Sequence, residues 1–316
     1  MNLTTGVVRT TLAALARVAP RAAAGVALPL FRTPTGRSRL RPAEEPVMLR
    51  ARPDRFEVNG KAVDVFAWGD GARPVLLMHG WQSRASRFAP LIAALLDRGY
   101  SPVAFDAPGH GGSGGRTTTI LEYREIARRL HQRHGRFTAV IAHSIGGLAA
   151  FFSVREQAPA DRVITLSAPA DFDHVVDRFC AQLRLGPRVG TELRRRIESR
   201  MFPEERDIWA RFAATHRPAD LTQPILVVHD EADDVIDPGQ ARRLVAAYGQ
   251  QADLLVTRGL GHRRIISDPR VAEAVLDFLA ATETTETAEG IERIETVTTP
   301  ADAVPVPEGS AADPVG

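Results

Sequence analysis

The stretch Ala142-His143-Ser144-Ile145-Gly146 is the most informative part of this sequence. An apolar run suited to a β-strand (residues 137–141) precedes it, and a run suited to a helix (residues 148–157) follows it. In such a strand–turn–helix setting, the serine of a G-x-S-x-G pattern stands on a sharp turn with its hydroxyl clear of the backbone. Ala142 takes the place of the first glycine of this pattern. The second glycine is Gly146, where a Cβ would crowd the turn. We therefore predict that Ser144 is a nucleophile.

A serine nucleophile needs a histidine as its base, and the histidine needs a carboxylate that holds its tautomer. Asp233 follows a second apolar run, residues 224–228, and so lies just past the end of a buried strand. His262 comes later, in a glycine-flanked loop (residues 259–262) that allows its side chain to reach over the edge of the sheet. The order Ser, Asp, His is that of α/β-hydrolases and differs from the order in chymotrypsin and subtilisin.

Over residues 56–281 the chain resembles the α/β-hydrolase superfamily. His79-Gly80-Trp81 is similar to that family's His-Gly segment after the third strand, and residues 106–113 are similar to its loop after the next strand. The resemblance implies a mostly parallel central sheet flanked by helices, with a helical cap inserted before the acid-bearing strand. It also implies that the backbone N–H groups of Trp81 and Ile145 form an oxyanion hole.

The segment before the acid-bearing strand leaves one alternative open for the triad. Asp171 and Asp173 rival Asp233, because some members of this family carry their acid after the preceding strand. Asp233 is favoured because its spacing matches the family and a turn-forming run follows it. The cap is expected at about residues 170–220. Its arginine run, residues 194–196, is interpreted as a solvated face, with anion binding as the alternative.

The composition is that of an ordinary globular enzyme. The chain has 316 residues, 44% of them hydrophobic, and a formal net charge of +2, so a nucleic-acid partner is not indicated. Cys180 is the single cysteine, so no intramolecular disulfide can form. His131 and His134 have the spacing of metal ligands but no acidic partner nearby in the sequence. No metal or cofactor is expected.

The two ends of the chain differ in composition from the middle. Residues 1–50 are expected to form a basic helical extension, residues 51–281 the hydrolase domain, and residues 282–316 a disordered tail. Arginines interrupt the apolar residues up to residue 31. No uninterrupted apolar stretch there reaches the about 18 residues that a membrane-spanning helix needs. The extension is expected to pack on the hydrolase body, through Leu12, Leu15 and Val18. Peripheral membrane contact through residues 1–31 and a cleaved export signal are the alternatives, and a cytoplasmic location is expected.

We predict a serine hydrolase that cleaves a carboxylic ester through an acyl-enzyme intermediate, with lipid-like esters and thioesters among the candidate substrates. A serine nucleophile argues against haloalkane dehalogenases, which use aspartate. The alternatives are other chemistry on this fold, namely C–C hydrolysis or cofactor-free haloperoxidase activity, and a non-catalytic module at a membrane surface. The partner is expected to be a small-molecule acyl ester. Neither the identity of that ester nor the oligomeric state follows from the sequence.

Overall fold

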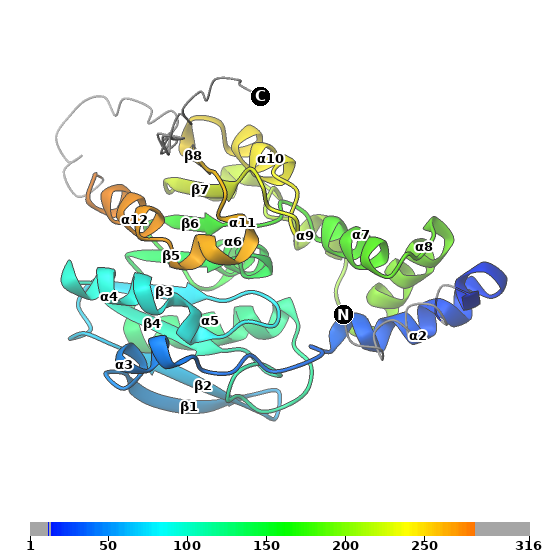
Figure 1. Cartoon of the computed structure of the whole chain (residues 1–316), viewed down its shortest axis with the longest axis horizontal. Helices are drawn as coiled ribbons and strands as arrows, with labels where there is room; N and C mark the ends of the chain where they lie inside the picture. The colour runs from blue at the N-terminus through cyan, green and yellow to red at the C-terminus, as the bar shows by residue number, and fades with distance from the viewer. Residues whose placement is uncertain (1–11, 13, 282–316) are drawn as a thin grey trace, which may run out of the picture.

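The computed structural model describes residue 12 and residues 14–281, which form an eight-stranded sheet covered by helices (Figure 1). The strands are β1 (Arg52–Val58), β2 (Lys61–Ala67), β3 (Pro74–Met78), β4 (Ser101–Asp106), β5 (Ala139–His143), β6 (Val163–Leu166), β7 (Ile225–Asp230) and β8 (Ala252–Thr257). Their order in the sheet is β1-β2-β4-β3-β5-β6-β7-β8. The pairings β1–β2 and β2–β4 are antiparallel, and all the others are parallel. The predicted fold class is confirmed.

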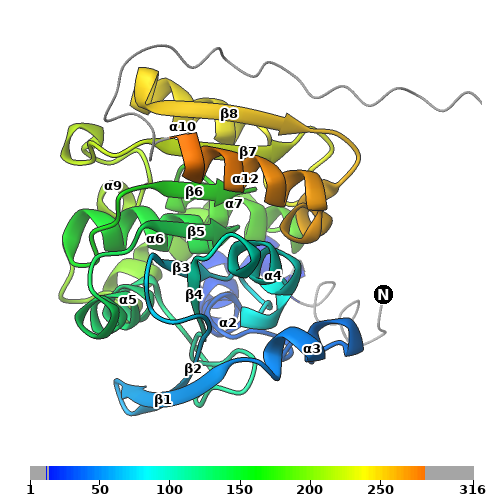
Figure 2. The same cartoon turned by 90° about the vertical axis from the view of Figure 1, so that its left-hand side faces the viewer.

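The central strands are buried on both faces because helices cover the sheet from both sides (Figure 2). One apolar cluster joins the sheet to α4 (Ala89–Asp97) and α12 (Pro269–Ala281). The other cluster joins it to α5 (Ile120–His134), α6 (Ile145–Glu156) and α10 (Gly239–Tyr248). A strand covered on both faces needs a continuous apolar run, which is the pattern that the sequence shows at β3, β5 and β7.

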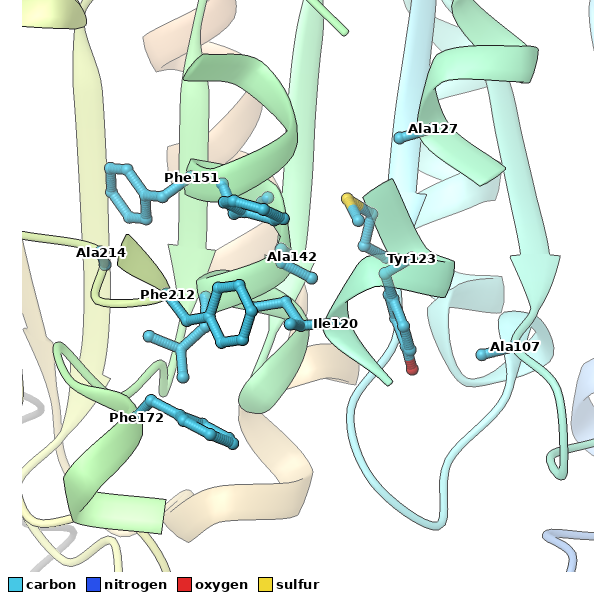
Figure 3. Packing of buried hydrophobic residues seen from close by; sticks show 14 of the residues in the cluster. Ala107, Ile120, Tyr123, Ala127, Ala142, Phe151, Phe172, Phe212 and Ala214 are labelled. Atoms are coloured by element: carbon cyan, nitrogen blue, oxygen red, sulfur yellow. The ribbon is translucent and has the colours of Figure 1, made fainter. Parts of the chain in front are cut away.

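Between β6 and β7 the chain forms a group of inserted helices. They are α7 (Phe172–Gln182), α8 (Pro187–Arg196) with a π-helical turn after it (Ile197–Met201), and α9 (Ile208–Arg211). Three rings of this group, Phe172, Phe202 and Phe212, contact one another edge to face, with centroids 5.0–6.3 Å apart. Phe212 attaches the group to the body, because its ring also contacts Phe152 of α6 at 5.1 Å. Figure 3 shows Phe172 and Phe212 in one cluster with Phe151 and Ala142 of the body.

The N-terminal extension packs against the inserted helices. Helix α2 (Pro20–Arg32) contacts α8 and buries Ala23, Ala24, Ala27 and Leu28. From α2 the chain runs across the molecule to α3 (Glu45–Met48) (Figure 1). We call residues 33–41 the N-terminal strap. Arg37 holds the strap by donating to carbonyl oxygens of the loop after β4, including Gly111 at 3.0 Å and Gly115 at 2.7 Å.

The packing of the extension differs in part from expectation. Leu12 is buried and Leu15 packs against the core, but Val18 is 83% exposed, so its predicted contact is wrong. The helical run is interrupted at Ala19, and Pro20 begins a second helix whose buried face is made by other residues. Pro20 fits the first helical turn, where its missing N–H costs nothing.

Residues 1–11, residue 13 and residues 282–316 lie outside the described part of the chain. The prediction of a disordered tail at residues 282–316 therefore lies outside the described residues as well. Among the residues described, no helix combines the length and apolarity needed to span a membrane.

Deleting residues 1–35 is expected to lower the melting temperature by about 5 °C or more, because it exposes the apolar face that α8 shares with α2. Thermal unfolding measures this, and Leu28→Asp (9% exposed) should act in the same direction while Val18→Asp (83% exposed) should not. Salt-sensitive co-sedimentation of the full chain with anionic vesicles, lost on truncation without a change in melting temperature, would support membrane contact through residues 1–31 instead.

Candidate active site

Ser144 lies on a strained turn between β5 and α6. Its backbone has φ 57° and ψ −133°, which a residue with a Cβ seldom adopts. A Cβ added at Gly146 would lie 2.5 Å from the carbonyl oxygen of Met78, so this position requires glycine. Helix α6 begins at Ile145, three residues earlier than the apolar periodicity indicates. Glycine is a poor helix former, but both glycines of this first turn lack room for a Cβ. At Gly147 an added Cβ would lie 2.4 Å from Cβ of Ala168.

The structure brings Ser144, His262 and Asp233 into one hydrogen-bonded chain. His262 lies in the short helix α11 (Gly261–Arg264), and its Nε2 is 3.0 Å from Oγ of Ser144. Its Nδ1 is 2.9 Å from Oδ2 of Asp233, which follows β7. All three residues are at most 8% exposed. This is the geometry that general-base activation of a serine hydroxyl requires.

Asp233 is held as a carboxylate. Burial by itself would raise its pKa, but the hydrogen bond and charge of His262 and a backbone N–H bond from Ile236 outweigh burial and lower the pKa to about 2. Oδ1 accepts the N–H groups of Val235 and Ile236, both at 2.9 Å. Oδ2 therefore accepts the Nδ1–H of His262. With its proton on Nδ1, the ring directs the lone pair of Nε2 at the serine hydroxyl.

The loop after β3 passes directly beside the serine. A Cβ added at Gly80 would lie 2.7 Å from Cβ of Ser144 and 3.0 Å from the carbonyl oxygen of His143. His79 holds this loop, because its Nε2 accepts the N–H of Ala107 at 3.0 Å and its Nδ1 lies 2.7 Å from the carbonyl oxygen of Gly80. Burial lowers the pKa of His79 to about 4, so its ring is neutral and donates through Nδ1.

The predicted oxyanion donors are the backbone N–H groups of Trp81 and Ile145. Ile145 is the first residue of α6, and an α-helix leaves its first N–H groups without an intrahelical acceptor. Trp81 directly follows Gly80, and both Trp81 and Ile145 line the same cavity as Ser144. Trp81 packs edge to face on His110, with ring centroids 5.2 Å apart.

His143, the residue before Ser144, lies beside the histidine of the hydrogen-bonded chain. Its ring lies 4.8 Å from the ring of His262. Its Nε2 donates to the backbone carbonyl of His262 at 2.8 Å. Burial and the neighbouring His262 lower the pKa of His143 to about 3, so the ring is neutral and supports the loop that carries His262. No periodicity in the sequence signals this contact, which joins residues 119 positions apart.

The rival acids lie in other contacts. Asp171 pairs with Arg243 at 2.5 Å, and Asp173 pairs with Arg194 at 2.7 Å. Arg194 also pairs with Asp177, so this part of the 194–196 run is a solvated, ion-paired face. Among the described residues no cluster of three or more His, Cys, Asp or Glu side chains could hold a metal ion.

Ser144 and His262 open into a cavity of about 1230 Å³. The inserted helices contribute Phe172, Val175 and Phe179, among others, to the lining of this cavity. The cavity is also lined by residues 30–33 and much of the strap, which the sequence did not indicate. Phe31 contacts Phe179 edge to face with centroids 5.2 Å apart, so α2 joins α7 in the apolar wall.

Comparison with known proteins matches this arrangement to a family. The model of the alpha/beta hydrolase family matches residues 75–275. A serine hydrolase-like protein of Danio rerio is 33% identical over 109 residues, which is 31% of this chain. The chain spans about a third (32%) of the length of that relative.

Solved structures share the fold at low sequence identity. An esterase of Pyrococcus furiosus has a TM-score of 0.60 at 19% identity, covering 79% of this chain and 97% of its own. A monoacylglycerol lipase of Paleococcus ferrophilus has a TM-score of 0.56 at 19% identity, covering 69% and 98%. A thioesterase domain from the curacin biosynthetic pathway has a TM-score of 0.54 at 16% identity, covering 73% and 99%. With the family match over residues 75–275, the conclusion is that this chain belongs to the alpha/beta hydrolase family.

Proposed function

We propose that this protein is a serine hydrolase that cleaves a carboxylic ester, as an oxygen ester or a thioester, through an acyl-enzyme intermediate. The observation that carries the proposal is the hydrogen-bonded chain from Ser144 through His262 to Asp233 at a large cavity. Residues 51–281 would form the hydrolase domain, with the inserted helices as its cap and residues 1–50 as an extension.

In the first half of the reaction, Oγ of Ser144 attacks the acyl carbonyl carbon while Nε2 of His262 takes the hydroxyl proton. Asp233 stabilises the resulting imidazolium. The oxyanion accepts hydrogen bonds from the N–H groups of Trp81 and Ile145. When the tetrahedral intermediate collapses, His262 gives the proton to the leaving oxygen or sulfur, and the alcohol or thiol departs.

In the second half, His262 removes a proton from water, and the hydroxide attacks the acyl-Ser144 carbonyl. Collapse releases the carboxylic acid and returns the proton to Oγ. The active-site donors to the oxyanion are main-chain groups, so the side chain of Trp81 remains available to shape the acyl pocket.

Gly80→Ala is expected to lower kcat by about 10²–10³, the effect of losing one oxyanion donor. The added Cβ would lie 2.7 Å from Cβ of Ser144, so the loop that carries Trp81 must move away. Gly36→Ala is the matched control, because Gly36 also lines the cavity and an added Cβ there meets nothing within 4 Å. Steady-state kinetics on both variants, with circular dichroism to check folding, measures the effect. Equal turnover by the two would contradict the proposed position of the oxyanion.

A graded series of p-nitrophenyl esters and matched thioesters tests the proposed activity itself. The apolar wall around Phe31, Phe172 and Phe179 favours longer acyl chains, so kcat/KM should rise at least about tenfold from acetate to octanoate. Labelling of Ser144 by a fluorophosphonate without turnover of any ester or thioester would support Ser144 as the nucleophile and contradict ester hydrolysis. The protein would then be assayed for C–C hydrolysis and haloperoxidase activity.

A further inference from the structure

The charged residues that line the cavity are almost all of one sign. Among the described residues around it are seven arginines and a single carboxylate, Glu44. The arginines are Arg32, Arg37, Arg41, Arg87, Arg178, Arg263 and Arg264. A cleft lined by one sign of charge concentrates ligands of the opposite sign. The overall charge of the chain is only +2, so this imbalance is local to the cavity.

Glu44 does not neutralise the lining. It is 6% exposed, pairs with Arg87, lies 3.8 Å from Nε of Arg41 and accepts the hydroxyl of Ser86 at 2.6 Å. One carboxylate with two arginines still leaves positive charge on that side of the cavity. The five other arginines have no carboxylate among the residues that line the cavity with them.

Three of those five arginines are occupied by neutral acceptors. Arg37 donates to carbonyl oxygens of the loop after β4, Arg264 to the carbonyl of Leu260 at 3.1 Å, and Arg178 to the carbonyl of Asp234. A carbonyl orients a guanidinium without cancelling its charge. Within the described part of the chain, the guanidinium groups of Arg32 and Arg263 have no hydrogen-bond or ion-pair partner, so their donors are available to a ligand.

The cavity also has an apolar side. Phe31 of α2 lies edge to face against Phe172 and Phe179 of α7, with centroids 6.4 Å and 5.2 Å away. Val175 and Leu183 of the same inserted helices continue this wall. One cavity therefore has an apolar wall for an acyl chain and a basic lining that an uncharged ester would not use.

The position of His262 tells which half of the substrate meets the arginines. In the proposed function His262 protonates the leaving oxygen or sulfur, so the leaving group lies beside it. Arg263 and Arg264 directly follow His262 in α11, and both line the cavity. The acyl half then lies against the apolar wall, and the leaving half lies toward the arginines.

Resting on the proposed function, we propose that the substrate is an acyl ester or thioester whose alcohol or thiol half is anionic and carries a phosphate or a carboxylate. Arg263, which directly follows His262 in α11, would pair with that anion, and Arg32 at the end of α2 would add positive charge to the same cavity. A guanidinium can donate two parallel hydrogen bonds to a phosphate or to a carboxylate. Because both anions share this chemistry, the experiment is designed to distinguish them.

Two matched substrate pairs test the proposal on the full-length enzyme. Octanoyl-coenzyme A carries phosphates, and octanoyl-N-acetylcysteamine has the same thioester bond without them. p-Nitrophenyl octanoate is paired with the same ester bearing a ring carboxylate. We expect kcat/KM to be about tenfold higher for the charged member of at least one pair, with an advantage that shrinks as salt is added. An advantage in the first pair alone identifies phosphate, and one in the second pair alone identifies carboxylate.

Equal kcat/KM within both pairs would overturn this inference without contradicting ester hydrolysis. Absence of turnover on all four substrates, together with absence of fluorophosphonate labelling, would overturn the proposed function and this inference with it. The two failures are thus distinguishable on one enzyme preparation.

The double variant Arg32→Gln/Arg263→Gln tests the assigned residues. We expect the charged-to-neutral ratio of kcat/KM to fall about tenfold, and to be largely retained in Arg32→Lys/Arg263→Lys, which keeps both charges. The ratio is taken on one sample, so partial misfolding cancels. Arg242→Gln, an exposed arginine on α10 outside the cavity lining, is the control and should keep the wild-type ratio. A wild-type ratio in the double glutamine variant would reject the assignment.

Discussion

Ser144→Ala is expected to lower kcat by about 10⁶, the largest effect of any single substitution considered for this chain. The hydroxyl lies 3.0 Å from Nε2 of His262, and its removal leaves the base without a nucleophile to activate. The strained backbone at φ 57° places Ser144 at the cavity.

The measurement is labelling by a fluorophosphonate probe together with turnover of a p-nitrophenyl ester. Wild-type protein should be labelled and Ser144→Ala should not. Ser83→Ala is the matched control, because Ser83 also lines the cavity but lies in the loop after β3. Equal labelling of wild type and Ser144→Ala would show that the nucleophile is a different residue.

Asp233→Asn is expected to lower kcat by about 10⁴ while the protein stays folded. The N–H groups of Val235 and Ile236 both donate to Oδ1, so an asparagine would keep its carbonyl oxygen there. Its amide NH₂ would then face Nδ1 of His262. That ring would be held with its proton on Nε2, which could no longer accept the serine proton.

Asp171→Asn and Asp173→Asn are the controls for this prediction, and kinetics on all three variants makes the comparison. Asp171 pairs with Arg243 and Asp173 with Arg194, so neither substitution should change the tautomer of His262. Near-normal turnover by Asp233→Asn, alongside a severe loss in one of the others, would mean that the acid follows the preceding strand instead.

Much of the fold could be predicted because its signals are local. The buried strands β3, β5 and β7 appear as apolar runs, since both faces of each strand are covered. The turn at Ser144 is signalled by its small neighbours, because Gly146 lies too close to the backbone of β3 for any Cβ. The chain order of Ser144, Asp233 and His262 places each after a strand, and the ends of parallel strands meet at one edge of a sheet.

Other features could not be predicted because they depend on contacts between distant segments. The ring of His143 lies against that of His262, and a residue pattern near position 143 carries no information about a loop 119 residues later. Val18 is exposed because the helix that packs against α8 begins anew at Pro20. Amphipathic spacing identifies a buried face only while one helix continues.

By itself, the sequence determined the fold class, the sharp turn at Ser144 and the candidates Asp233 and His262, because strand burial and turn chemistry are written in consecutive residues. Only the tertiary structure decided which acid reaches His262 and what surrounds the serine. The cavity is assembled from α2, the N-terminal strap, the loop after β3 and the inserted helices. Its apolar wall and its excess of arginines exist only where those segments pack together, because side chains far apart in the chain share no periodicity that could reveal their contact.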